Sequence, residues 1–296
     1  MQRLFMWMFS LLLAGASFIA QAAGDTKAAQ LLAAARAALG GEKAAAKVQG
    51  LACAGTIQRL IGDRQVSGEF SIDLQLPDKM LRTDSINPIG DAVVVTGQGV
   101  NGDTLIRTGR VLNAPPGAVF RIPPPPDAGS EAEAQAIRNS RAELTRLSVA
   151  LLITAPASLP VDFTYGGEAE SPDGKADVLD LKGTGNFAAK LLLDKSSHRP
   201  LMLVYKGVSP RVVVQTQRGG SPSDAAALAH GGGAPGQPGT PELVEINMFF
   251  DDYKSVDGVL LPHHITRAIG GETSEEWTFK TIKVNPVFKA DTFSAR

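Results

Sequence analysis

Apolar and polar residues alternate from Gln65 to Leu76, and this pattern constrains the fold more than any other feature of the sequence. Successive side chains of a β-strand point to opposite faces, so this segment is predicted to be a strand with one covered face and one face in water. The apolar set is Val66, Phe70, Ile72, Leu74 and Leu76, and the polar set is Ser67, Glu69, Ser71, Asp73 and Gln75. A sheet covered on one face is typical of antiparallel architectures.

About a dozen segments of the chain fit strands, and turn residues such as Asp257-Gly258 and Gly270-Gly271 separate them. The strands do not alternate with helices, which argues against a parallel doubly wound sheet. The length is sufficient for one large domain. We therefore expect a single mainly β (α+β) domain over residues 23–296.

Two long helices are expected beside these strands. The first covers residues 26–39, and Gly40-Gly41 supplies its left-handed stop. The second begins at Ser130, where Glu133 completes a capping box, and it runs to about Ile153. This helix can pack on the sheet as an ordinary element or act as a movable lid, and the pattern allows both.

Several strands are apolar on both faces, in particular around Leu191 to Leu193 and Leu201 to Val204. Such strands need a cover on each side. An ordinary two-layer core meets that need, and so does a curved sheet wrapped around a cavity for an apolar ligand. The sequence pattern does not separate the two interpretations.

The first 22 residues have the features of a secretory signal peptide. Arg3 carries their only charge, an apolar run follows from Leu4 to Ala20, and Ala20-Gln21-Ala22 gives the A-x-A cleavage pattern. The alternative is a membrane anchor, but the run is short for a spanning helix and lacks a basic flank. We expect export, with cleavage after about Ala22.

Charge and cysteine content narrow the class of protein further. Loss of Arg3 leaves 28 basic and 30 acidic residues, and no basic cluster is interleaved with aromatics, so nucleic acid is not an expected partner. Cys53 is the only cysteine, so an exported form would have no internal disulfide. We expect Cys53 to be a buried apolar residue.

Two segments interrupt the strands. Residues 109–129 contain Pro115-Pro116 and a run of four prolines, Pro123 to Pro126, and are expected to form an irregular loop. Residues 219–241 are rich in Gly, Pro, Ala and Ser and are expected to form a flexible insertion between strands.

The recognised catalytic and metal-binding motifs do not fit this chain. Gly97 to Gly102 matches the pattern G-x-G-x-x-G, but a strand rather than a phosphate-binding helix is predicted after it. His263-His264 would point to opposite faces of a strand, so the pair is poorly placed to hold one ion. The sequence contains no G-x-S-x-G segment. We therefore predict that the protein is not an enzyme and that it binds no metal ion and no cofactor.

The C-terminal third carries motifs of a known family. Phe249 to Tyr253, Val256 to Pro262, Val284-Asn285-Pro286 and Asp291-Thr292-Phe293 follow one another as strand, hairpin, strand and ending. Together with Gly40-Gly41 and the Leu76 to Lys79 corner, they resemble the periplasmic outer-membrane lipoprotein carrier (LolA-like) superfamily. The resemblance implies an unclosed antiparallel β half-barrel whose concave face is covered by the two long helices.

The same resemblance implies a soluble periplasmic protein that carries or senses a lipid or an acylated lipoprotein in an apolar cavity, with only transient membrane contact and without a metal or organic cofactor. The candidate lining residues are Phe70, Ile72, Leu74, Leu144, Leu147, Leu151, Leu191, Leu193, Ile265, Trp277 and Phe279. The alternative for each is a plain core residue, which is the more common role of a buried apolar side chain. The alternative function is an envelope scaffold that binds a protein partner and no small ligand.

Overall fold

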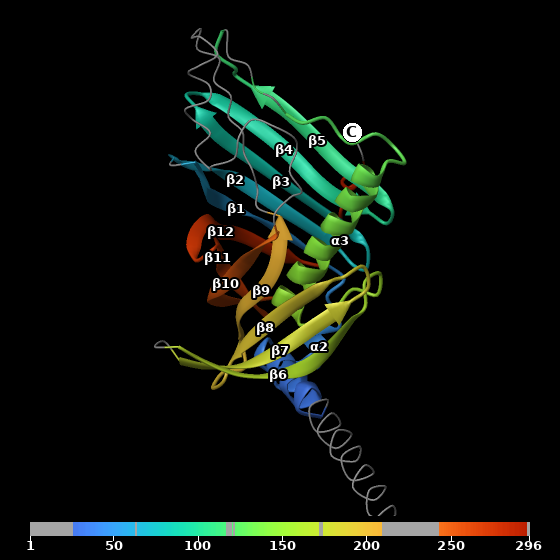
Figure 1. The fold of residues 1–296 in the computed structure, drawn as a ribbon, viewed down its shortest axis with the longest axis vertical. Helices are drawn as coiled ribbons and strands as arrows, with labels where there is room; N and C mark the ends of the chain where they lie inside the picture. Colours follow the sequence, from blue (N-terminus) through green and yellow to red (C-terminus); the bar gives the residue numbers. More distant parts are fainter. Residues whose placement is uncertain are drawn as a thin grey trace, which may run out of the picture.

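The chain folds into one antiparallel sheet of twelve strands that does not close on itself (Figure 1). The structure is a computed structural model and describes residues 26–62, 64–116, 120, 122–171, 174–208 and 243–294. The strands are β1 Gly50–Ile61, β2 Arg64–Gln75, β3 Lys79–Ile89, β4 Ala92–Asn101, β5 Thr104–Leu112, β6 Val161–Ser171, β7 Gly174–Gly183, β8 Ala188–Asp194, β9 Pro200–Val208, β10 Leu243–Val256, β11 Val259–Ile269 and β12 Glu272–Val284. The described helices are residues 26–38, α2 Glu42–Ala45 and α3 Glu131–Leu152. The prediction of a mainly β fold is confirmed.

The order of the strands explains the position of the long helix. Strands β1 to β5 run outward from the middle of the sheet to one edge, and β6 to β12 run back from the other edge until β12 pairs with β1. Helix α3 is the connection between the two edges, and it lies across one face of the sheet (Figure 1). Its 22 residues span about 33 Å, and it contacts β3, β4 and β5 towards one edge of the sheet and β9 on the other half.

Local sequence fixes both ends of α3. The Ser130 hydroxyl accepts a hydrogen bond from the Glu133 amide at 3.1 Å, which confirms the predicted N-cap, while the Glu133 carboxylate accepts from the Gly129 amide instead of the Ser130 amide. At the other end Ile153 adopts a left-handed conformation with φ 52° and closes the helix. The first half of α3 is largely exposed, whereas the segment from Leu144 to Leu152 is buried. The helix is therefore anchored in the core by its C-terminal half.

The N-terminal helix packs near the end of α3. The Arg36 guanidinium donates a hydrogen bond to the Ile153 carbonyl at 3.2 Å, and the Leu260 amide donates to the Leu39 carbonyl at 2.9 Å. Of the two helices expected over the concave face, only α3 is seen to cross the sheet (Figure 1). The expectation that both helices cover that face is not confirmed.

Two of the family-like motifs have structural roles in this fold. A Cβ atom at Gly40 would lie 2.1 Å from the Gly258 carbonyl oxygen, so the helix end and the β10–β11 hairpin require glycine at their contact. The Asn285 side chain accepts a hydrogen bond from the Gln49 amide at 2.7 Å and donates one to the Lys47 carbonyl at 3.0 Å. The Gly40 contact therefore joins the N-terminal helix to the β10–β11 hairpin, and Asn285 joins the segment before β1 to the end of β12.

A single hydrophobic cluster joins the N-terminal helix, α3 and the covered face of the sheet. Cys53 is buried within it, as predicted. Burial, with a smaller contribution from nearby Asp73, raises the pKa of the Cys53 thiol to about 12. The thiol is therefore neutral at physiological pH and behaves as an apolar residue.

Some sequence predictions concern residues that the structure does not describe, and others concern the ends of described strands. The predicted signal peptide, residues 1–22, and the insertion, residues 219–241, lie outside the described residues. Strand β5 continues to Leu112, so the proline-rich loop begins later than the expected residue 109. Gly97 to Asn101 belong to β4 and Gly102 to the turn after it, and the strand predicted after this segment is β5. No helix in the described residues is long and apolar enough to cross a membrane.

Candidate functional site

A cavity of about 740 Å³ lies between α3 and the sheet. Its lining comes from α3 and from strands β1, β3, β4, β5, β9, β10, β11 and β12. Its apolar lining on the covered face of the sheet includes Met80 and Ile246, which are buried, and Ile269, which lies opposite Ile246. The remaining lining includes a cluster of charged side chains, which is the main chemical feature of the cavity.

Strand register places three of these charges in a row. Glu275 on β12 lies opposite Arg59 on β1 and opposite Arg267 on β11. Two positions further along the same face, Trp277 lies opposite Ile57 and Ile265. The covered face of the sheet therefore changes from apolar to charged within one step of the strand alternation.

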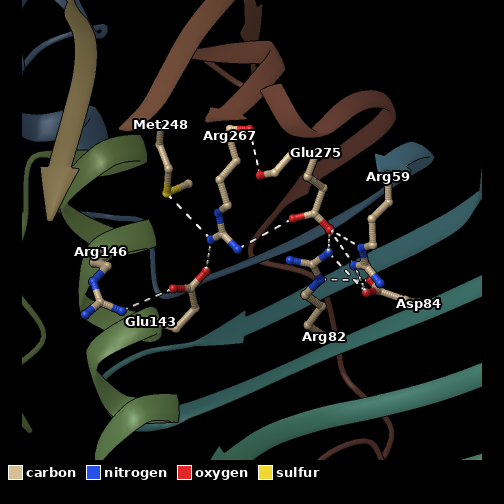
Figure 2. A network of polar contacts seen from close by, with 9 residues as sticks. Arg59, Arg82, Asp84, Glu143, Arg146, Met248, Arg267 and Glu275 are labelled. Atoms are coloured by element: carbon tan, nitrogen blue, oxygen red, sulfur yellow. Dashed lines mark hydrogen bonds and ion pairs between the residues drawn. The ribbon is translucent and has the colours of Figure 1, made fainter. Parts of the chain in front are cut away.

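A compact group of ion pairs forms at the β1–β3 side of the cluster (Figure 2). Arg82 donates to Asp84 at 2.8 and 3.1 Å and to Glu275 at 2.6 Å. Arg59 donates to Asp84 at 2.5 Å and, through Nε, to Glu275 at 2.9 Å. Each of these two arginines therefore binds two carboxylates, and both carboxylates are buried.

A second group joins the helix to the sheet (Figure 2). Glu143 on α3 accepts a hydrogen bond from Arg267 on β11 at 2.6 Å, and its second oxygen lies 3.4 Å from the Arg146 guanidinium. Arg267 also lies 3.5 Å from Glu275, so the two groups form one continuous network. We call these seven residues, Arg59, Arg82, Asp84, Glu143, Arg146, Arg267 and Glu275, the arginine cluster.

Mutual attraction keeps the buried glutamates ionised. Burial alone would raise the pKa of Glu275, but Arg82, Arg59 and Arg267 outweigh burial and hold it far below its ordinary value. Burial opposes ionisation of Glu143 in the same way, and Arg267 and Arg146 hold its pKa below the ordinary value. Both side chains therefore carry charge at neutral pH.

Aromatic rings form the boundary between the arginine cluster and the apolar core. The Arg82 and Arg267 guanidinium carbons lie 4.5 and 5.0 Å from the centre of the Trp277 ring. The Arg146 guanidinium lies 4.0 Å from the centre of the Tyr205 ring. These cation–π contacts hold the planes of the guanidinium groups in place.

The arginine cluster has more hydrogen-bond donors than acceptors. Its four arginines face three carboxylates, and the Nε atoms of Arg146 and Arg267 are buried without a hydrogen-bond partner. Four guanidinium groups supply roughly twenty N–H donors, whereas three carboxylates supply roughly twelve acceptor positions. The cluster can therefore accept a further anionic group.

The apolar residues predicted as ligand contacts are all placed in the hydrophobic core. All of Phe70, Ile72, Leu74, Leu144, Leu147, Leu151, Leu191, Leu193, Ile265, Trp277 and Phe279 are buried in one cluster, and none of them lines the 740 Å³ cavity. The structure thus brings these residues together, and their contact with a ligand stays a prediction. Within the described residues, no group of three or more His, Cys, Asp or Glu side chains is placed to hold a metal ion.

The sequence analysis did not identify the arginine cluster, although the strands carry a signal for it. Arg59 follows Ile57 on the buried set of positions in β1, and Glu275 precedes Trp277 in the same way on β12. A charge in the apolar half of an alternating strand needs a buried partner. This pattern identifies Arg59 and Glu275 as buried charges, but it does not identify the residues with which they pair.

Solved structures provide the available comparisons. No protein-family model and no curated protein matches the sequence. The chain is similar to a DUF1329 family protein from Desulfovibrio piger, with 11% identity, 90% of this chain and 97% of that chain covered, and a TM-score of 0.46. It is also similar to the LolA superfamily protein NE2245 from Nitrosomonas europaea, with 11% identity, 88% and 97% covered, and a TM-score of 0.43.

A third similar structure is a putative outer membrane lipoprotein-sorting protein domain from Vibrio parahaemolyticus, with 10% identity, 82% and 88% covered, and a TM-score of 0.40. The superfamily named from the sequence motifs is thus among the structural neighbours of the chain. At these scores, the function has to be argued from the residues of this chain.

Proposed function

We propose that this chain is an exported periplasmic protein that binds a lipid or the acylated end of a lipoprotein in the cavity between α3 and the sheet. The observation that carries the proposal is the mixed lining of that cavity. Apolar side chains of Met80, Ile246 and Ile269 lie on the same face of the sheet as the buried charged cluster. An amphiphile has the matching division into an apolar chain and a polar head.

The size of the cavity suits such a ligand. Its volume of about 740 Å³ lies in the range of roughly 300–1,000 Å³ that is typical of small-molecule sites. Each buried methylene contributes about 0.8 kcal/mol, so about ten methylenes gain roughly 8 kcal/mol before ordering costs are subtracted. This gain supports reversible binding, which a carrier or sensor requires.

In this proposal α3 acts as a lid over further apolar surface. The helix is held over the sheet by the Glu143–Arg267 hydrogen bond and by its buried residues Leu144, Leu147 and Leu151. If the helix lifts, these leucines and other members of the hydrophobic cluster, such as Leu191 and Ile265, become available to an acyl chain. Contact between a ligand and the buried apolar residues therefore requires α3 to move.

A second candidate function, an envelope scaffold, is favoured by the edges of the sheet. Strands β5 and β6 stand at the two ends of the strand order, and β6 has no fully buried residue among those described. An edge strand offers backbone donors and acceptors to an incoming strand of a partner protein. If this chain binds a partner protein while it carries no lipid, that result would favour the scaffold function.

Titration with a fluorescent fatty acid tests the leading proposal. Protein without the first 22 residues should increase the fluorescence of the probe with saturation, and unlabelled fatty acid should displace the probe. Ile269→Glu places a charge in the apolar lining of the cavity and should weaken binding about tenfold or more.

The matched control is Leu112→Glu. Leu112 lies on a strand but is exposed and does not line the cavity, so this variant should bind like the unmodified protein. Equal binding by both variants, or no binding by the unmodified protein, would contradict the proposal.

A further inference from the structure

The charge of the cavity lining calls for an anionic ligand group. In the arginine cluster four guanidinium groups face three carboxylates, which leaves one formal positive charge in excess. The lining also contains Arg107 and Glu272, which offset each other, whereas Lys206 points to the opposite face from Tyr205, so the excess stays at one. A cavity with this balance favours an anionic group over a neutral one.

Stability alone does not account for this cluster. Removing ion pairs from water costs more than their attraction returns in many proteins, so a buried ion pair is weak evidence for a stabilising role. Here the pairs line a cavity instead of being sealed in the core, and the arginine side chains remain 15–23% exposed. Ionised groups of this kind in a cleft mark a functional site.

The four arginines of the cluster differ in how many of their N–H donors form hydrogen bonds. Arg59 and Arg82 each bind both Asp84 and Glu275 at hydrogen-bond distance. Arg146 makes one contact within the cluster, at 3.4 Å to Glu143. Its Nε has no partner, and Tyr205 stacks on its guanidinium plane. Arg146 is therefore held in position while most of its donors are unused.

Arg267 is the second arginine with unused capacity. It shares Glu143 with Arg146, and its Nε also has no partner. The two guanidinium groups thus flank one carboxylate on the cavity wall, as Figure 2 shows. Guanidinium groups bind carboxylate and phosphate oxygens with two parallel hydrogen bonds, which a neutral hydroxyl cannot reproduce.

We infer that the cavity selects amphiphiles with an anionic head group, a carboxylate or a phosphate, and that Arg146 and Arg267 hold this head group. The inference rests on the proposed function and names its ligand class. The alkyl chain leaves the head group along the apolar lining formed by Met80, Ile246 and Ile269. When a neutral amphiphile binds, the excess N–H donors of the arginine cluster remain without an anionic acceptor.

Calorimetric titration with ligands that share one alkyl chain tests the inference. Decyl phosphate, decanoate and decanol differ only in the head group, and inorganic phosphate has no chain. We expect decyl phosphate and decanoate to bind about ten- to a hundredfold more tightly than decanol, which is the range of a charge-assisted hydrogen-bond pair. Added salt should weaken the binding of the anionic ligands and leave that of decanol unchanged.

Variants of α3 identify the residue that binds the head group. Arg146→Gln should reduce the affinity for decyl phosphate about tenfold or more and leave that for decanol unchanged, and Arg146→Lys should restore part of the loss. Arg138→Gln is the matched control, because Arg138 lies on the exposed part of the same helix, pairs with Glu131 and does not line the cavity. It should bind like the unmodified protein.

The outcomes separate the two proposals. Equal affinities for decanol and decyl phosphate would overturn the head-group inference and leave the binding function intact. If inorganic phosphate binds as tightly as decyl phosphate, the inference that the ligand is an amphiphile is wrong. Absence of binding for all four compounds would contradict the proposed function itself. Because the ligand comparison uses the unmodified protein, the test does not depend on the folding of any variant.

Discussion

The Glu143 carboxylate on α3 accepts a hydrogen bond of 2.6 Å from the Arg267 guanidinium on β11, across 124 positions of the sequence. Each partner is more than four-fifths buried. The contact joins the crossing helix to the middle of the sheet at the wall of the cavity (Figure 2). It therefore couples the stability of the fold to the candidate site.

Glu143→Gln should lower the free energy of unfolding by about 1–3 kcal/mol. The substitution leaves Arg267 and Arg146 without their shared anion, and a buried charge that has lost its partner is costly. Urea unfolding followed by circular dichroism measures the effect. The control is Glu131→Gln at the exposed start of the same helix, whose ion pair with Arg138 is in water and should contribute little. Equal stability of both variants would show that Glu143 does not tie α3 to the sheet.

Stability should fall as the solution becomes acidic. Glu275 and Glu143 have a lower pKa in the folded protein than in the unfolded chain, where a glutamate titrates near 4.3. Their contribution is therefore complete above about pH 5 and decreases as the pH falls through and below that value. Unfolding free energies measured from pH 3 to pH 7 test this dependence. Glu275→Gln should flatten the acid limb, and an unchanged slope in that variant would contradict the assignment.

Cys53 should be chemically inert in the folded protein. Burial raises the pKa of its thiol to about 12, so almost no thiolate exists at pH 8. Iodoacetamide should therefore leave native protein unmodified and label the single cysteine after unfolding in urea, as measured by mass spectrometry. Rapid labelling of the native protein would place Cys53 at an accessible surface instead.

Leu147→Ala should destabilise the protein by about 2–5 kcal/mol. Leu147 is almost fully buried on α3, so its truncation leaves a cavity beneath the helix. Leu201→Ala removes the same atoms from a side chain that is 40% exposed and should cost much less. Thermal unfolding of the two variants gives the comparison. Similar midpoints would mean that α3 is not packed on the core at Leu147.

Local sequence signals predicted the elements of this fold well. The alternation after Gln65 gave strand β2, and the Ser130–Glu133 capping box gave the start of α3. Each signal acts through neighbours within a few positions, so it can be seen in one sequence. The position of helix 26–38 relative to the sheet depends on contacts such as Arg36 with Ile153, which no local pattern reveals.

The arginine cluster could not be assembled from the sequence for the same physical reason. Arg59 and Glu275 lie 216 positions apart and meet only because β12 pairs with β1 in one register. A shift of one residue would turn one of them to the opposite face. The apolar residues were easier to predict, because burial requires only a hydrophobic side chain and no particular partner.

Native mass spectrometry of the protein, purified from its exported form, tests the central claim most directly. The account predicts a co-purifying mass that matches a fatty acid, a phospholipid or an acylated peptide with an anionic head group. The mass should be lost when the protein is unfolded and should return when an anionic amphiphile is added back. A protein that is bare when isolated, and that takes up no such amphiphile afterwards, would contradict the account.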